Sequence, residues 1–332
     1  MRVPAWTAAG WTRHAATAAG LTALSVVAYL LLKGVQGDRG QVVLLVVVWA
    51  IALTGLNLIT GLGGYPSLAH VSFFGGGAYL SAYLLGKGLP MALCALLAVG
   101  GTMLAGLVVA LVFSRTRGQY FAIGTMFFTA VTNLVLTNAA DVTGGPNGRP
   151  VDLGFSLDTT LVLLAASLGL SLGAFYALSR SRFGDRLRAI REDEDLAQHV
   201  GVPTARVMLI AMVVSSAFGA WAGVLFAQYN GVIAPSQFTF VQGFLMLVAI
   251  GLGGGGRLLA PLVGSAVVIG FTQLIKLGPG VSQIVLGVLF ILVTLLVPNG
   301  ILGGITALRR RPRPTAPDVP APAPARAKEV AS

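Results

Sequence analysis

Long apolar runs separated by short polar segments form the main pattern of this chain. Most of the runs are about 20 residues long, which is the length that a helix needs to cross the hydrocarbon core of a membrane. The pattern therefore predicts an all-α, polytopic membrane protein with about ten transmembrane helices. The predicted spans are residues 15–32, 41–60, 66–86, 89–113, 119–138, 158–179, 206–229, 238–252, 258–276 and 279–297.

The composition supports a membrane-embedded body. Charged residues make up 10% of the chain and apolar residues 55%, with a mean hydropathy of +0.84, whereas a soluble domain carries about 25% charged residues. The single cysteine, Cys94, excludes a disulfide framework and a thiolate metal site. Arg13 precedes the first apolar run as in a signal peptide, but no small-x-small cleavage site follows Leu32, so we expect a retained helix.

The basic residues predict which side each loop faces. With both termini in the cytoplasm, 17 of the 22 lysines and arginines fall on the cytoplasmic side, as the positive-inside rule requires. This bias accounts for the net charge of +11 without nucleic acid as a partner. The chain then divides into a cytoplasmic N-terminus (1–14), a transmembrane domain (15–304) and an Ala/Pro-rich, disordered cytoplasmic tail (305–332).

Two glycine-rich stretches, Leu56–Tyr79 and Ala249–Ala266, interrupt apolar runs in the two halves of the chain. Non-helical backbone at membrane depth is tolerated only where protein or a water-filled cavity satisfies its polar groups. Paired interruptions of this kind indicate a translocation site between two repeats, although close packing of small residues is an equally open interpretation of the second stretch. The residues predicted to break the helices are Gly61, Gly63, Gly64, Gly253, Gly254 and Gly255.

Polar residues accompany the first of these interruptions. His70 is the only histidine within a predicted span, and three roles are open for it: structural hydrogen bonding, lining of a pathway, and carrying a proton. No second histidine or acid stands at ligand spacing, so a metal site is not expected.

Asp158, the first residue of the span predicted at 158–179, is the only aspartate or glutamate within any predicted span, and none lies deeper in one. Ion-coupled transporters usually place carboxylates in the membrane to bind sodium ions or protons. The chain also lacks a G-x-x-x-x-G-K-[ST] phosphate-binding loop. Energy for transport must therefore come from another subunit, or the protein is a passive pore.

The densest cluster of charge is residues 180–206, which we call the charged island. Apolar residues recur in it at intervals of three and four, which predicts a short amphipathic helix near 185–190 followed by a turn and a second segment. We expect its apolar edge to dock into a groove of a soluble partner. The alternative is a solvated loop that only sets topology, but its five acids do not contribute to the positive-inside signal.

Several ordered motifs of the chain resemble a known family. The segment SRFGDRLRAIREDEDLAQHVGV is similar to the coupling loop of ABC-importer permeases, and NLITGLGGYPSLAHVSFFGGGAY resembles a signature of the branched-chain amino acid permeases of the LivM group. The blocks RGQYFAIGTMFFTAV, DVTGGPNG, GGGGRLLAPLVGSA and VPNGILGG also match in order, from about Leu56 to Gly304. Departures occur at Tyr65, Ala69 and Arg257, and Asp195 and Leu196 replace Glu and Ala of the coupling motif.

The resemblance implies a permease subunit of an ABC importer in the bacterial cytoplasmic membrane, with no enzymatic activity of its own. It implies a LivH-type second permease, two ATPase subunits that bind ATP and magnesium, an extracytoplasmic substrate-binding protein and surrounding lipid as partners. It further implies that the charged island couples to the ATPases. The implied coupling residues are Phe183, Gly184, Asp185, Leu187, Arg188, Ile190, Arg191, Asp195, Ala197 and Gly201.

The substrate implied by the family is a branched-chain amino acid, and relatives in the same group are associated with urea and short amides. A passive channel for a small neutral solute stays open as an alternative, as does an intramembrane enzyme that pairs His70 with Ser67 or Ser72. The residues predicted to line the path are Asn57, Tyr65, Ser67, His70 and Phe73, with Thr143, Gly144 and Gly145 at the outer mouth.

Overall fold

The computed structural model describes residues 8–34, 37–113, 116, 118–152, 154–274 and 300–309, together with isolated positions between 281 and 291. Apart from those isolated positions, the predicted tenth span, residues 279–297, lies outside the described residues, as does the tail beyond residue 309.

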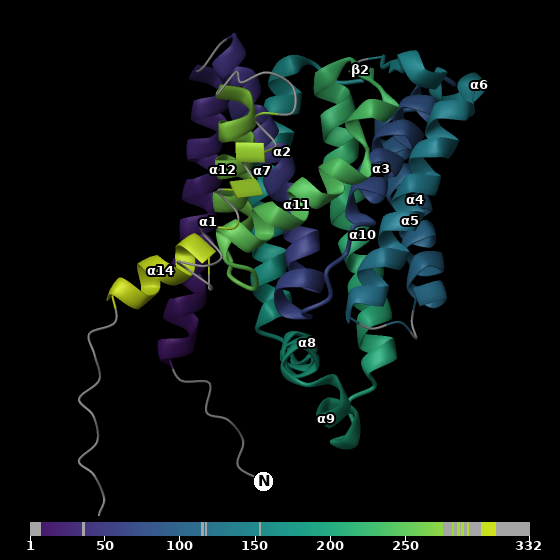
Figure 1. Cartoon of the computed structure of the whole chain (residues 1–332). Coiled ribbons are helices and arrows are strands. Elements are labelled where there is room, and N and C mark those ends of the chain that lie inside the picture. Colours follow the sequence, from purple (N-terminus) through teal and green to yellow (C-terminus); the bar gives the residue numbers. More distant parts are fainter. Residues whose placement is uncertain are drawn as a thin grey trace, which may run out of the picture.

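Helices make up nearly all of the described chain (Figure 1). One group contains α1 (Ala8–Gly34), α2 (Asp38–Leu56), α7 (Leu157–Ser179) and α12 (Ala260–Leu274), and a second contains α3 (His70–Leu85), α4 (Met91–Phe113), α5 (Gly118–Asn138) and α10 (Thr204–Asn230). Between them lies α11 (Phe240–Gly253). The remaining elements are η1 (Asn57–Leu62), α6 (Ala140–Thr143), η2 (Gly145–Asn147), β1 (Arg149–Pro150), α8 (Arg182–Glu192), α9 (Glu194–His199), β2 (Val232–Ile233), η3 (Pro235–Gln237) and α14 (Gly300–Arg309).

Seven helical segments of the described residues are long and apolar enough to cross a membrane. An eighth apolar helix, Ala260–Gln273, is shorter, and α3 has 16 residues. The prediction of an all-α, polytopic membrane protein is therefore confirmed in its class. The predicted third span is wrong at its start, because the chain is not helical from residue 66 but only from His70.

Small departures from the predicted boundaries occur elsewhere. The two-residue strands β1 and β2 pair antiparallel, with Arg149 opposite Ile233, so the fold is not purely helical. Helix α14 extends to Arg309, beyond the predicted start of the tail at residue 305.

Glycine permits very close contact between the central helices. A Cβ atom on Gly77 of α3 would meet the backbone of Ala220 of α10, and one on Gly223 of α10 would meet the carbonyl of Phe74. Backbones that approach this closely are typical of helix pairs in membranes, where packing rather than the hydrophobic effect drives association. These contacts hold α3 against α10. They thereby fix the position of the helix that follows the first glycine-rich stretch.

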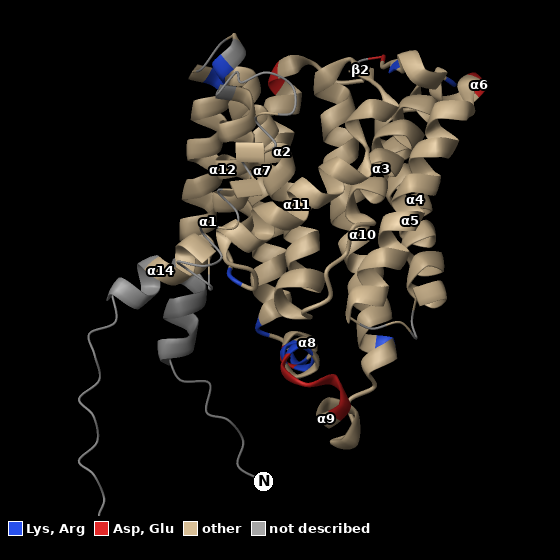
Figure 2. Ribbon diagram, viewed as in Figure 1, with Lys and Arg blue, Asp and Glu red and all other residues tan. Residues whose placement is uncertain are grey.

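The charged residues lie at the two ends of the helix bundle (Figure 2). One end carries α8 and α9, and the opposite end carries α6 and the β1–β2 pair. Between the ends, large apolar side chains face outward, for example Leu96 at 69% and Leu104 at 65% exposure. An uncharged, apolar outer belt between two charged ends is what a lipid bilayer requires.

Candidate functional site

The first break lies directly after α2. The π-helix η1 extends this helix to Leu62, and the chain then leaves the helical path until His70 begins α3. Gly64 has a φ of 77°, a left-handed conformation that glycine adopts without steric cost. The Thr60 hydroxyl donates to the carbonyl of Tyr65 at 2.9 Å, so part of the freed backbone is satisfied by a side chain. Of the three glycines predicted to break the helix, Gly63 and Gly64 lie in the interruption, whereas Gly61 lies in η1 just before it.

The second break lies between α11 and α12. Gly253 is the last residue of α11, and Gly254, with a φ of 94°, ends the helix in a left-handed conformation. A Cβ atom on Gly253 would also meet the carbonyl of Ala260 at the start of α12. The glycines of this stretch therefore interrupt the helix and also let its two flanking helices pack closely, and its role in a translocation site stays a prediction.

The side chain of Asn57 joins the two breaks. Its amide nitrogen donates to the carbonyl of Arg257 at 2.9 Å, and its amide oxygen accepts from the backbone N–H of Gly256 at 2.8 Å. Asn57 is completely buried. Gly61 lies so close that a Cβ atom there would meet both the Asn57 side chain and the Gly256 nitrogen. The break in the first half is thus hydrogen-bonded to the break in the second half.

Helix α8 of the charged island packs against this joint. Its Leu187 and Ile190 are buried, and a guanidinium nitrogen of Arg191 donates to the carbonyl of Gly61. The stem of Arg191 also lies against Gly64, where a Cβ atom would come within 2.8 Å of its Cγ. Helix α8 is therefore in direct contact with the first break.

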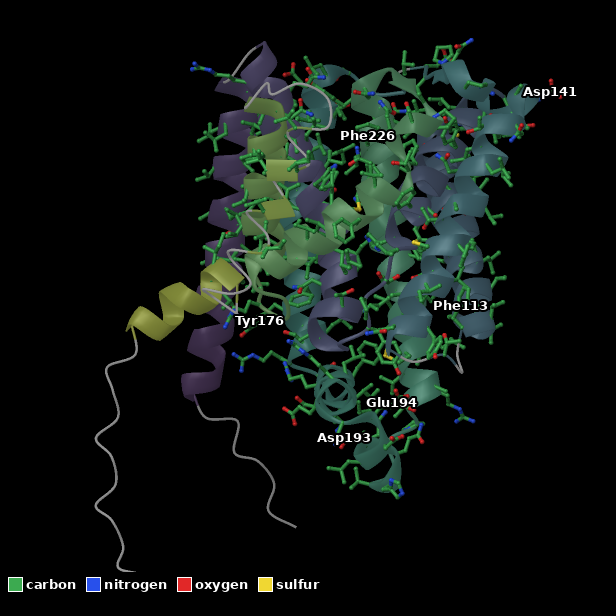
Figure 3. The ribbon with its side chains drawn as sticks, viewed as in Figure 1. Phe113, Asp141, Tyr176, Asp193, Glu194 and Phe226 are labelled. Atoms are coloured by element: carbon green, nitrogen blue, oxygen red, sulfur yellow. The ribbon has the colours of Figure 1, made fainter. Side chains whose placement is uncertain are left out.

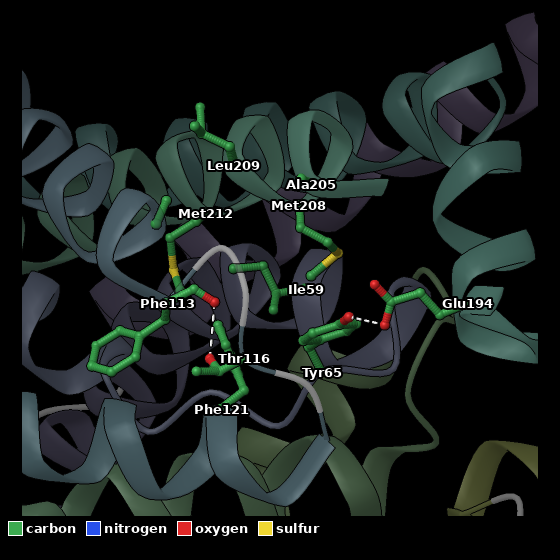
Figure 4. A pocket seen from close by; sticks show the side chains of 11 residues that line it. Ile59, Tyr65, Phe113, Thr116, Phe121, Glu194, Ala205, Met208, Leu209 and Met212 are labelled. Carbon is green, nitrogen blue, oxygen red and sulfur yellow. Dashed lines mark hydrogen bonds between the residues drawn. The ribbon is translucent and has the colours of Figure 1, made fainter. Parts of the chain in front are cut away.

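Helix α9 makes a second connection to the same segment. The Asp193 carboxylate accepts from the N–H of Leu196 at 2.9 Å and so caps α9, as expected for aspartate at a helix start. The Tyr65 hydroxyl donates to the Glu194 carboxylate, and the two side chains face each other in Figure 4. Tyr65 also packs edge-on against Phe121, with ring centroids 5.2 Å apart.

The apolar edge of the charged island faces the membrane domain of this chain and not a soluble partner, so the predicted docking of this edge is wrong. We expected this edge to dock into a soluble partner, but Leu187, Ile190 and Ala197 are buried within this chain. The exposed apolar side chains of the island are instead Leu196, at 61%, and Val200, at 70%. The reason is that these residues pack in one cluster with apolar side chains of the first break, among them Leu58, Ile59 and Leu62.

The predicted second segment is confirmed as a helix, because α9 follows α8 after Asp193. Phe183 is half-buried beside the apolar edge of α8. Gly184 lies against the carbonyls that end α7, and Gly201 has a φ of 86° after α9. Exposed Asp185 forms an ion pair with Arg188 at 2.7 Å, and exposed Asp195 accepts from His199 through its carbonyl.

A cavity of about 500 Å³ opens beside the joined breaks. We call it the inner cavity, because it lies on the α8 side. Arg188, Arg191 and Arg257 contribute to its lining, and no acid does so among the described residues. The other lining residues are Thr60, Gly61, Leu62, Pro66, Leu247, Ile250, Gly251, Gly254, Gly255 and Gly256.

His70 is a buried structural residue with both ring nitrogens engaged. Its Nε2 lies 2.7 Å from the Ala52 carbonyl, and its Nδ1 lies 3.2 Å from the Ser215 hydroxyl. Because a carbonyl only accepts, Nε2 carries the proton and Nδ1 accepts from Ser215. The ring therefore connects α2, α3 and α10. This geometry favours structural hydrogen bonding over the two other roles considered for His70.

The pairing of His70 with Ser67 or Ser72, which the alternative of an intramembrane enzyme would need, does not occur. His70 contacts Ser215 rather than Ser67 or Ser72, and the Ser72 hydroxyl donates to Thr129 at 3.2 Å. Ser67 is buried with its hydroxyl oxygen unpartnered. No group of three or more His, Cys, Asp or Glu residues within the described ranges has the arrangement of a metal site.

The remaining path residues are distributed over the molecule rather than gathered in one site. Phe73 is buried beside His70, with ring centroids 6.3 Å apart. Thr143 is buried and donates to the carbonyl of Leu136 at 2.7 Å, and Gly144 and Gly145 follow it in left-handed conformations. These last three lie at the α6 end, whereas Asp193 and Glu194 mark the opposite end (Figure 3).

The sequence analysis missed two residues that hold the breaks through hydrogen bonds. Glu194 was counted only as an acid of the island, and Arg257 only as a departure from the family pattern. Nothing in their spacing showed that Glu194 would accept from Tyr65 or that the Arg257 carbonyl would accept from Asn57. In each of these two hydrogen bonds, donor and acceptor are more than 100 residues apart in the sequence.

Membrane-crossing helices, joined helix breaks and a charged helix docked on them are the features of a transport permease. The chain belongs to the family described as branched-chain amino acid transport system / permease component, whose model matches residues 39–294. The family inferred from the ordered motifs is therefore confirmed, and the protein is a multi-pass membrane protein.

Three relatives illustrate the similarity. The chain is 30% identical to the high-affinity branched-chain amino acid transport system permease protein LivM of Escherichia coli, over 85% of this chain and 74% of that protein. It is 28% identical to the corresponding LivH protein of the same organism, over 77% and 91% of the two chains. It is also 28% identical to the probable branched-chain amino acid transport permease protein LivM of Methanocaldococcus jannaschii, over 49% and 50%.

Proposed function

We propose that this chain is the permease subunit through which an ABC importer moves branched-chain amino acids across the cytoplasmic membrane. Family membership supports the substrate class. The observation that carries the mechanism is the chain of contacts from α8 through Arg191 to Gly61 and from Asn57 to the second break. It links the charged island to the joined breaks in the two halves of the chain.

Alternating access then follows from the geometry. ATP-driven closure of partner ATPases moves α8 and α9 on the cytoplasmic side. Arg191 passes this movement to η1, and Asn57 passes it to the glycines after α11. Glycine backbone at both breaks accepts the change in dihedral angles, as hinge residues do. ATP and magnesium belong to the ATPases and not to this chain.

The partners follow from the surfaces that the chain exposes. Exposed Leu196 and Val200, with the charged outer face of α8, form the docking surface for an ATPase. The similarity to both LivM and LivH proteins supports pairing with a LivH-type second permease. With two ATPases and an extracytoplasmic substrate-binding protein, these subunits complete the importer. The ten-span topology with both termini cytoplasmic and the disordered tail are parts of the same proposal.

Co-purification and transport test this function. The chain should bring ATPase subunits with it, and the reconstituted complex should accumulate radiolabelled leucine against its gradient only when ATP is supplied. Uptake of urea in place of leucine would assign the importer to short amides. Downhill flux without ATP and without bound ATPase would establish a passive channel and refute the importer.

A further inference from the structure

A second large cavity lies on the other side of α11 from the inner cavity. We call it the outer cavity, because it lies toward β2, at the end opposite α8 (Figure 1). It encloses about 440 Å³, within the range of about 300–1,000 Å³ that is usual for small-molecule sites. Its lining residues are Gln41, Leu45, Trp49, Phe74, Phe226, Asn230, Ser236, Gln237, Gln242, Leu245, Met246, Val268, Ile269, Thr272 and Gln273.

The deep part of the outer cavity is apolar. Trp49, Phe74, Phe226 and Met246 are all buried and come from four different helices. The rings of Phe74 and Phe226 pack with centroids 5.2 Å apart. Such a floor accepts a branched aliphatic group and removes it from water, which is favourable because apolar surface is buried.

The mouth of the outer cavity is polar but carries no charge. Along α2 the lining changes from Gln41 through Leu45 to Trp49 at steps of four residues, which place all three on one helix face. Along α12 the lining likewise changes from polar Gln273 to apolar Ile269. Carboxamide groups predominate at the polar end, and no Asp, Glu, Lys or Arg is among the described residues that line the cavity.

We infer that the outer cavity is the site that receives the aliphatic amino acid from the extracytoplasmic side, an assignment that rests on the proposed function. The zwitterion carries no net charge, so a neutral lining does not repel either end. Carboxamides donate N–H groups to the carboxylate and offer oxygens to the ammonium group. The side chain then occupies the apolar floor. The opposite ends of the ligand thus match the opposite ends of the cavity.

Helix α11 separates the two cavities. Its Gln242, Leu245 and Met246 line the outer cavity, whereas Leu247, Ile250 and Gly251 line the inner cavity. The same helix ends at the second break, which Asn57 holds. Movement of α8 through this joint displaces the wall between the cavities, which gives the bound amino acid a route inward.

Two substitutions test the outer cavity in the complete reconstituted importer. Leu245→Trp fills the cavity, and Gln242→Glu places a carboxylate in a neutral site next to the ligand carboxylate. We expect each to lower ATP-driven leucine uptake by about tenfold or more, which corresponds to about 1.4 kcal/mol, because an unpaired buried charge and an overfilled cavity both disfavour binding. Phe244→Trp is the matched control, because Phe244 lies between these positions but is half exposed on the outer face of α11.

The readouts separate a site from a folding defect. Complex assembly, measured as the amounts of all subunits that co-purify, should match the unsubstituted importer for all three variants, Phe244→Trp should also keep its leucine uptake, and Gln242→Asn should restore most of the uptake lost in Gln242→Glu. Normal leucine uptake by Leu245→Trp and Gln242→Glu would refute the outer cavity as the site. An unsubstituted complex that hydrolyses ATP but imports no leucine would refute the proposed function, and the amino-acid assignment of the cavity with it.

Discussion

At the scale of the residue, the joint between the two breaks depends on one asparagine and one glycine. Asn57 satisfies a backbone N–H and a backbone carbonyl of the second break, both part-buried beside the inner cavity. Unsatisfied groups of this kind cost about 1–3 kcal/mol each. Gly61 is the neighbour that leaves room for this arrangement.

Gly61→Ala should therefore impair transport. The added methyl group would meet the Asn57 side chain and the Gly256 backbone nitrogen, and overpacking of about 1–3 kcal/mol corresponds to a loss of about fivefold or more in ATP-driven leucine uptake. Uptake should be measured per assembled complex. Gly100→Ala in α4 is the control, because nothing lies within 4 Å of its added Cβ atom. Equal uptake by the two variants would show that the joint tolerates expansion.

At the scale of the element, α8 and α9 have two faces with different tasks. The inner face of α8 packs on the first break through Leu187, Ile190 and Arg191. The outer surface carries the charged residues of α8 and the exposed Leu196 and Val200 of α9. The amphipathic pattern of α8 is therefore used to attach a cytoplasmic helix to the membrane body, which leaves α9 to present apolar side chains outward.

This division predicts two separable defects. Leu196→Asp should lower the amount of ATPase that co-purifies, because a carboxylate would replace an exposed apolar contact. Arg191→Ala should leave that amount unchanged but lower leucine uptake about fivefold or more, because it removes a charged hydrogen bond worth about 1.5–3 kcal/mol. Quantitative capture of the ATPase and uptake by the same preparations provide the comparison. If Arg191→Ala lost the ATPase and Leu196→Asp retained it, the inner face would be the docking face and the assignment would be wrong.

At the scale of the whole molecule, the charged residues form two layers with an apolar belt between them (Figure 2). The α6 end and the α9 end must then face opposite aqueous compartments. The excess of basic residues predicts that the α9 end faces the cytoplasm, as in the proposed topology. The outer cavity opens toward the other compartment, where a substrate-binding protein would deliver its ligand.

Single cysteines test this orientation. Asp141→Cys and Asp193→Cys, each combined with Cys94→Ala, should react with a membrane-impermeant maleimide from opposite sides. We expect Asp141→Cys to be labelled in intact cells and Asp193→Cys only in inverted vesicles. The unsubstituted protein is the control and should stay unlabelled in both, because Cys94 is completely buried. Labelling of both positions from one side would contradict the topology.

Local patterns of the sequence determined much of this protein. Apolar length predicted the membrane helices because a bilayer has a set thickness, and clustered glycines predicted the breaks because interrupted helices at membrane depth need residues that tolerate unusual dihedral angles. The order of the motifs from Leu56 to Gly304 predicted the family. Periodicity also predicted the amphipathic island, since a helix face is a property of neighbouring residues.

Only the tertiary structure decided which residues meet. Asn57 and Arg257 are 200 residues apart, and Tyr65 and Glu194 are 129 residues apart, so no local pattern contains these contacts. The direction of the apolar edge of α8 was predicted wrongly because periodicity shows that a face exists but not what covers it. The outer cavity collects residues from helices distributed along the chain, and such a surface exists only after those helices have packed.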